Sequence, residues 1–308
     1  MKFRTPRDFP RHLTRSALLL LTVLVASPGF ASGPVEASGD LGTGHGHMAY
    51  GRFADAAQSF ERAARHAAKT HDEDGQLHAL QALAEARQAL GAPDQAVIAL
   101  KQAIALAESR GDPRWNALLQ AQLGNTRLQS GRVDEARPLL VTALEAARTQ
   151  KNPAFVAAVL NDLGSLHGIA NDSVAARDAF DEARRLAQET NNHALALRVL
   201  LNAAALELAL REPGRARELA HAAQQVARQL EAQPYLQVQG LIRSGLILSQ
   251  VAQLDARERQ ETTRAAHAVL RAALQQAESL QEPRLVSAAS GALGNVYLLA
   301  NRRTEALT

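Results

Sequence analysis

Cysteine is absent from this sequence, and aromatic residues are scarce. With no cysteine among 308 residues, disulfides, zinc–thiolate sites and a cysteine nucleophile are excluded within this chain. Aromatic residues make up 4%, and the runs of Val, Ile, Tyr and Thr that favour strands are essentially missing. Alanine and leucine dominate a hydrophobic fraction of 46%, and both favour helices. The composition therefore predicts an all-α protein with a sizeable core.

A basic surface is also missing from most of the chain. The formal net charge is +3. In residues 1–31, however, Lys2 and four arginines oppose Asp8 alone, and this excess is larger than the net charge of the whole chain. The remainder is near neutral, with both signs interspersed, and offers no electrostatic footprint for a phosphate backbone. We therefore expect no nucleic-acid partner.

Residues 1–31 have the layout of a secretory signal peptide. A basic segment precedes the apolar run Ala17–Ala26, and small residues occupy positions −3 and −1 of a cut after Ala31. The alternative is a membrane anchor, but about ten apolar residues cannot span ~30 Å of hydrocarbon. There is no twin arginine and no cysteine for lipid attachment, and no later segment is apolar enough to cross a membrane. We predict export by the general secretion route to the periplasm or the exterior of a bacterial cell.

Alanines recur along the rest of the chain at intervals of forty residues, with one interval of fifty. The first series is Ala56, Ala96, Ala136, Ala176, Ala216, Ala266 and Ala306. A second series, seven residues on, is Ala63, Ala103, Ala143, Ala183, Ala223 and Ala273. A third, four residues further, is Ala67, Ala107, Ala147, Ala187, Ala227 and Ala277. Between the first two lies a mostly bulky position: Phe60, Leu100, Leu140, Phe180, Ala220 and Leu270. Spacings of 4, 3 and 4 place these positions on one helical stripe.

A second helix precedes this one in each repeat. Its mark is a small residue twelve positions before the first alanine series in the regular repeats: Ala84, Gly124, Gly164, Ala204, Ser244 and Gly294. A small residue lets the two helices approach closely. Turn sequences such as Gly91-Ala92-Pro93-Asp94 and Asp112-Pro113 separate the helices, and proline there begins the next helix. The second helix of each repeat is predicted at 53–69, 93–109, 133–149, 172–189, 213–230 and 260–280, with every series alanine buried.

This pattern resembles the tetratricopeptide repeat. The clearest copies are LGNTRLQSGRVDEARPLLVTAL (Leu123–Leu144) and LGSLHGIANDSVAARDAFDEAR (Leu163–Arg184). The resemblance extends from about residue 41 to the end and implies an all-α α-solenoid, a right-handed superhelix of antiparallel helix pairs. The sequence departs from the family in its period of forty instead of thirty-four, and in its loss of most large aromatic residues on the first helix, Tyr297 excepted.

The array is predicted to be irregular at both ends and at one insertion. Residues 32–50 are Gly-rich and suggest a degenerate N-terminal cap, followed by about six repeats over 51–308. Ten extra residues near 250–261, in the fifth interval of the alanine series, indicate a lengthened connection between two helices, formed as a helical extension or as a binding loop. The last repeat is incomplete, so we expect a longer protein. We also expect apolar surface on 284–300, which would self-associate or recruit a partner. The apolar face of this helix should cover the preceding helix on one side, while its own partner helix is missing on the other; the residues of the face are Leu285, Ala289, Ala292, Leu293 and Val296.

No constellation of catalytic or cofactor-binding residues is evident. His45-Gly46-His47 is the only tight histidine pair, and a third metal ligand is not apparent. The glycine-rich segment 42–46 neither follows a strand nor ends in Gly-Lys-Ser/Thr, and no nucleophile elbow or dinucleotide fingerprint occurs. We therefore predict a binding protein without enzyme activity, cofactor or metal.

In tetratricopeptide arrays the first helix of each pair lines a concave groove, which the resemblance carries over to this chain. The predicted partner-binding residues are Gln81, Gln122, Asn125, Asn161, Asp162, Asn202 and Asn295. Glu85, Gln129 and Ser165 also face inward, and an apolar half of the groove is predicted from Leu201, Leu241, Leu248 and Leu298. Such a groove suits an extended peptide. Of the basic residues that the family uses to clamp a C-terminal carboxylate, only Arg198 and Arg243 lie near suitable positions, which does not favour that mode.

The predicted function is an exported protein–protein interaction scaffold that binds a peptide or protein in its groove. Long-period arrays behind a signal peptide resemble the N-terminal halves of bacterial CHAT-domain proteins, which implies a peptidase domain beyond Thr308. The alternative is the extracytoplasmic sensor region of a signalling protein such as a histidine kinase. A His/Cys peptidase domain downstream would indicate the first, and a transmembrane span the second.

Overall fold

The structure is a computed structural model that describes residues 39–302. The predicted signal peptide, residues 1–31, lies outside this range, as does Ala306. Within it the backbone forms 13 α-helices and no strand, which confirms the predicted all-α repeat array.

Helices alternate between an A and a B position of each repeat. The A helices are α2 (Asp40–Ala49), α4 (Glu73–Ala89), α6 (Pro113–Gln129), α8 (Pro153–Ile169), α10 (His193–Ala209), α12 (Pro234–Leu254) and α14 (Pro283–Leu299). The B helices are α3 (Phe53–Lys69), α5 (Pro93–Ser109), α7 (Val133–Thr149), α9 (Ser173–Glu189), α11 (Pro213–Ala227) and α13 (Arg259–Ser279). The predicted B segments agree with these bounds to within three residues.

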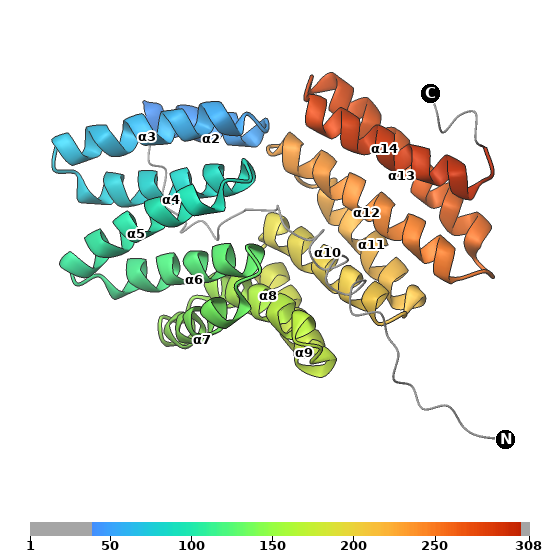
Figure 1. Cartoon of the computed structure of the whole chain (residues 1–308), viewed down its shortest axis with the longest axis horizontal. Helices are drawn as coiled ribbons and strands as arrows, with labels where there is room; N and C mark the ends of the chain where they lie inside the picture. The colour runs from blue at the N-terminus through green and yellow to red at the C-terminus, as the bar shows by residue number, and fades with distance from the viewer. Residues whose placement is uncertain (1–38, 303–308) are drawn as a thin grey trace.

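Consecutive helices pack side by side, and the A helices from α4 to α14 also contact the next A helix along the chain. The A helices therefore form a continuous inner layer. The hydrophobic core lies between the A and B layers in two clusters that meet at α10. Figure 1 shows the array curving round, so that the blue N-terminal pair α2–α3 comes close to the start of α12.

The period of forty follows from a uniform unit of one helix and one turn. Most helices have 17 residues, and three-residue turns join them. The middle residue of most turns has positive φ, either a glycine such as Gly131 or a residue such as Asn171. At Gly131 the Arg132 amide donates to the Arg127 carbonyl (2.9 Å) and the Gly131 amide to that of Leu128 (3.0 Å), a Schellman ending. Two such units give the repeat of forty residues.

The recurring alanines pack at the seam between the A and B helices. All of those described are buried, except Ala63 in the first repeat, which is half-buried. The prediction of burial is wrong for that residue because α2, at ten residues, covers less of its partner helix than the longer A helices do.

Glycines on the A helices admit the bulky side chains of the B helices. A Cβ on Gly164 would lie 2.8 Å from Phe180 Cδ1, and one on Gly124 would lie 3.0 Å from Leu140 Cδ2. In the sixth repeat, formed by α12 and α13, the glycine that meets Leu270 is Gly245. The assignment of this position to Ser244 is therefore wrong by one residue, because one extra residue precedes α12. Its start, Pro234, follows that of α10 by 41 residues instead of 40.

The irregular segments are helical. The Gly-rich N-terminal stretch forms α2 over Asp40–Ala49. The insertion near 250–261 lengthens α12 and α13 to 21 residues each, so a helical extension, not a long loop, accommodates it. On α14 all five residues of the apolar face are buried, and Leu298 is exposed. Self-association at this end stays a prediction.

Replacing Ala183 by valine tests the register of the seam. Ala183 is fully buried on α9, so two added methyl groups must displace neighbouring side chains. We expect the free energy of unfolding to fall by about 1–2 kcal/mol in a urea titration followed by circular dichroism. The same change at the exposed Ala105 of α5 is the control, and equal effects at both sites would contradict the packing described here.

Candidate functional site

Polar side chains line the A helices at one equivalent position. This position lies two residues before the small residue of each repeat and holds Gln122, Asp162, Asn202 and Arg243 on α6, α8, α10 and α12. The 40- or 41-residue spacing places these side chains on the same face of successive inner helices, so they can contact one another across the repeats.

Hydrogen bonds join these positions from α8 to α12. Asn161 Nδ2 donates to Asp162 Oδ1 (2.9 Å), and Asn202 Nδ2 donates to Asn161 Oδ1 (3.0 Å). Arg243 Nη2 then donates to Asn202 Oδ1 (3.4 Å). Asn161, Asp162 and Asn202 are buried, so their mutual bonds replace those lost to water.

The same arrangement continues to α4. Gln88 Nε2 donates to Thr126 Oγ1 of α6 (2.7 Å), while Gln81 Nε2 (3.2 Å) and Gln122 Nε2 (3.4 Å) both donate to Glu85 Oε1. We call the whole set the polar ladder. It comprises Gln81, Glu85, Gln88, Gln122, Asn125, Thr126, Gln129, Asn161, Asp162, Arg198, Asn202 and Arg243.

The acids of the ladder are held in an environment that disfavours their charge. Burial raises the pKa of Glu85 to about 8, although the bonds from Gln81 and Gln122 and the charge of Arg198 oppose the rise. The Glu85 side chain is half-buried by exposed area, and its carboxyl group is enclosed by protein. Burial likewise raises the pKa of Asp162, against the opposing charge of Arg198 and bonds from Asn161 and Asn125. The charge of Arg198 therefore favours the ionised form of both Glu85 and Asp162.

Arg243 is the cationic end of the ladder. Burial lowers the pKa of its guanidinium to about 10. Its Nη1 atom is buried and has no hydrogen-bond partner in the described part of the chain. The side-chain oxygens of Gln88 and Gln122 are also buried acceptors without a partner there. The ladder therefore has unused donor and acceptor capacity.

A small hollow lies against the middle of the ladder. Its volume is about 40 Å³, and its polar walls are formed by Gln88, Gln122, Asn125, Asp162 and Arg198. The apolar walls are formed by Leu118, Ala121, Phe155, Ala158 and Val159. A space of this size holds a water molecule or a small side-chain group, with polar contacts on one side and apolar contacts on the other.

Six of the seven predicted partner-binding residues belong to the ladder. The seventh, Asn295, is exposed on α14 and lies outside the set of hydrogen-bonded residues. The predicted apolar half is wrong for Leu201, Leu241 and Leu248, because these side chains are buried in the core. Sequence reasoning missed Gln88 and Thr126, and it gave Arg243 only a marginal place. That any of these residues binds a partner stays a prediction.

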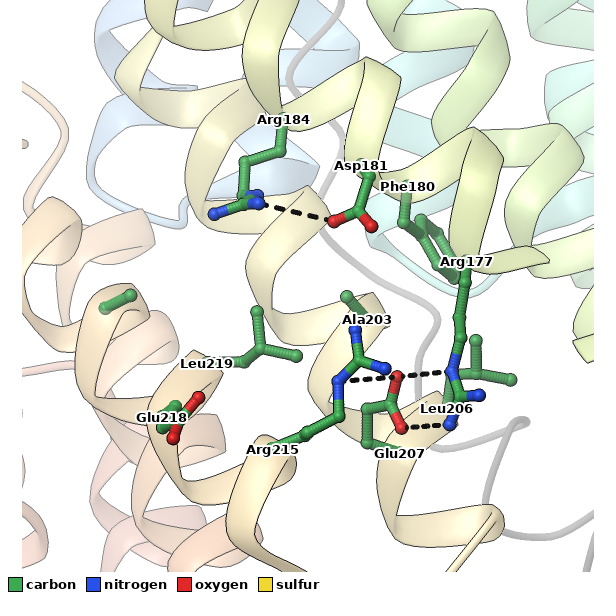
Figure 2. Close-up of a pocket in the computed structure, with 11 residues that line it drawn as sticks. Arg177, Phe180, Asp181, Arg184, Ala203, Leu206, Glu207, Arg215, Glu218 and Leu219 are labelled. Carbon is green, nitrogen blue, oxygen red and sulfur yellow. Dashed lines mark hydrogen bonds and ion pairs between the residues drawn. The ribbon is translucent and has the colours of Figure 1, made fainter. Parts of the chain in front are cut away.

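A second, larger hollow of about 210 Å³ lies between α9, α10 and α11 (Figure 2). The carboxylate of Glu207 accepts two bonds from Arg177, from Nε (2.8 Å) and Nη2 (2.7 Å), and lies 3.7 Å from Arg215 Nε. Arg184 and Asp181 form an exposed pair nearby. Arg177 and Arg215 both face Glu207, so these pairs join α9 and α11 to α10, and we interpret the hollow as a structural junction between repeats.

Within residues 39–302, no three His, Asp or Glu side chains gather as metal ligands, and no helix is both long and apolar enough to span a bilayer.

Comparisons with known proteins agree with the repeat geometry. Residues 79–114 and 116–189 each match a family described as Tetratricopeptide repeat. No curated protein matches the sequence. The crystal structure of BtubC (BKLC) from P. vanneervenii is similar, with 21% identity, TM-score 0.56, and coverage of 71% of this chain and 91% of that one. A Rap protein complexed with Competence and Sporulation Factor is also similar, with 17% identity, TM-score 0.60, and coverage of 96% and 89%. At these identities the likeness concerns the fold.

Proposed function

Because this chain is a tetratricopeptide repeat protein, we propose that it is an interaction scaffold whose polar ladder binds an extended segment of a partner protein. The repeat fold generally serves as a non-catalytic scaffold for protein partners, and the ladder is where this chain concentrates polar groups on its inner helices. A structurally similar Rap protein was crystallised with Competence and Sporulation Factor, which supports a ligand-binding role for such an array.

The observation that carries the proposal is the unused hydrogen-bonding capacity of the ladder. An extended peptide presents N–H donors and C=O acceptors along its whole length. The amide oxygens of Gln88 and Gln122 match the donors, and Nη1 of Arg243 matches an acceptor or an anionic group. The hollow between Phe155 and Gln122 offers space for one small side-chain group. Backbone bonds would provide affinity, and the hollow would provide some selectivity.

A selection from a library of linear peptides tests this function directly. We expect peptides enriched on the wild-type protein to lose affinity by about tenfold or more when Asn125 or Asn202 is replaced by alanine. Asn125 lines the hollow, and Asn202 accepts a bond from Arg243, so each change removes or displaces a group that would contact the peptide. Fluorescence anisotropy with a labelled peptide from the selection measures the change. Thermal melts show whether each variant remains folded.

The matched control is Val174→Ser on the outer helix α9, where Val174 is 68% exposed. This variant should bind the peptide as the wild type does. If selected peptides bind the Asn125 and Asn202 variants as tightly as the wild type, the ladder is not the binding site.

We also propose that the protein acts outside the cytoplasm, on the strength of the signal-peptide layout of residues 1–31. Mass spectrometry of protein recovered from the periplasm should show a new N-terminus near residue 32, and an intact Met1–Ala31 segment would contradict export. If the coding sequence continues beyond residue 308, a His/Cys peptidase domain there would support the CHAT-type context, which we favour. A transmembrane span there would support the sensor context.

A further inference from the structure

The first repeat touches the start of α12, although 182 positions separate the residues that meet. Phe53 begins α3, and Tyr235 lies in the first turn of α12. Their rings make an edge-to-face contact with centroids 4.9 Å apart. Phe53 is 5% exposed, an unusual value for the first residue of an outer helix. Figure 1 shows the α2–α3 turn beside the start of α12, and α2 and α12 also contact each other.

Gly51 makes this contact possible. It occupies the turn between α2 and α3 with φ 76°, and the Tyr235 ring lies directly on it, where a Cβ would stand. Gly91 and Gly131 occupy the equivalent turns of the next two repeats with φ 75°, and a Cβ on either would meet no atom within 4 Å. The three glycines therefore share a backbone conformation, but of the three only Gly51 has an aromatic ring packed against it.

Tyr235 is fixed to the C-terminal repeats on its other side. Its ring packs against the second core cluster, and burial raises the pKa of its hydroxyl, as does the nearby charge of Glu282, against that of Arg284. Glu282 caps α14, so Tyr235 lies between the first repeat and the connection from α13 to α14. Any change in curvature between the first repeat and α12 must move these two segments apart or together.

We propose that Gly51, Phe53 and Tyr235 form a clasp that closes the array around its inner face. The A helices that carry the ladder lie on the inside of the curved array that the clasp closes. An extended ligand therefore enters and leaves the ladder when the clasp opens. This effect on a ligand rests on the proposed function, whereas the closure itself does not. The clasp holds the array at one curvature and so fixes the spacing of the ladder residues.

The closure is measurable without a ligand. Because the chain has no cysteine, spin labels can be placed on Cys at the exposed positions Gln58 of α3 and Gln275 of α13 by two substitutions. Double electron–electron resonance should give one narrow distance distribution for this protein and for Tyr235→Phe, which keeps the ring. Gly51→Ala and Tyr235→Ala should give a longer or broader distribution. Gly91→Ala, which imposes the same backbone strain without the clash, should match the parent.

Ligand exchange is then measured with a labelled peptide from the library selection as the probe. We expect Gly51→Ala to raise the dissociation rate about 2- to 10-fold over that of Gly91→Ala, the range for losing one aromatic pair. Identical distance distributions for Gly51→Ala, Tyr235→Ala and the parent, in variants whose circular dichroism shows them folded, would overturn the clasp. A changed distribution with an unchanged dissociation rate would confirm the contact and overturn its role in ligand exchange. If no peptide is selected, the proposed function fails and the distance measurement still decides the closure.

Discussion

Replacing Arg177 by alanine is expected to lower the free energy of unfolding by about 2–4 kcal/mol. The side chain of Glu207 is only 3% exposed, and Arg177 supplies both of its close hydrogen bonds (Figure 2). Without Arg177, the buried carboxylate retains only Arg215, at 3.7 Å and half-exposed. The expected loss is below that of a fully enclosed pair, because the Arg177 side chain is itself 31% exposed.

Urea denaturation followed by circular dichroism measures this loss, with two variants as controls. Arg184→Ala removes an exposed partner of Asp181 on the same helix and should cost less than about 1 kcal/mol. The double variant Arg177→Met with Glu207→Leu replaces the pair by apolar groups and should recover most of the stability. If Arg177→Ala falls within a few tenths of a kcal/mol of Arg184→Ala, the ion pair does not hold the fourth and fifth repeats together.

The sequence predicts the helices well because the same pattern of small and bulky residues recurs in every repeat. A buried alanine at position 56, 96 or 136 says little alone, but the series fixes the phase of every B helix. The bounds of α3, α5 and α7 coincide with the predicted ranges for this reason. Local propensity, periodicity and tertiary packing all favour the same helices here.

The register of the repeats accounts for the ladder residues that were predicted and for the misplacement of Arg243, but not for the omission of Gln88 and Thr126. Asn161, Asp162 and Asn202 lie in repeats of 40 residues, so counting from the small residue places them correctly. Arg243 follows an extra residue before α12, and counting from Ser244 placed it one position out. Counting from the prolines that begin α8 and α12, Pro153 and Pro234, would have revealed the shift.

Core and groove positions on the inner helices are hard to separate by pattern. Twelve of the 17 residues of α10 are buried. The neighbouring A helices cover its two sides, and the B helices cover its outer face. A leucine such as Leu201 therefore packs in the core although helical periodicity directs it inward. The contact between Phe53 and Tyr235 is beyond any local pattern, since it depends on curvature accumulated over the intervening repeats.

The stability of the protein should also depend on pH through Glu85. Its pKa lies at about 8 in the folded state, against an ordinary value of 4.5, because burial opposes its charge. Between these values the folded state binds more protons than the unfolded state, so stability falls as pH rises from about 5 to 9. Full conversion at about 1.4 kcal/mol per unit would give nearly 5 kcal/mol. The half-buried side chain reduces the expected loss to about 2–3 kcal/mol.

Glu85→Gln isolates this dependence, because the amide resembles the protonated carboxyl in shape and stays neutral. The variant should match the wild type at pH 5 and exceed it in free energy of unfolding by about 2–3 kcal/mol at pH 9. Comparing the two proteins at each pH cancels the opposite effect of His45 and His78, whose pKa values burial lowers. Asp162, whose pKa burial raises, should add a decline with rising pH that both proteins share. Glu145→Gln, an exposed change on α7, should leave the pH profile unaltered. A constant gap between Glu85→Gln and the wild type across pH 5–9 would show that Glu85 carries its charge in the folded array, and that the ladder is more open to water than its packing indicates.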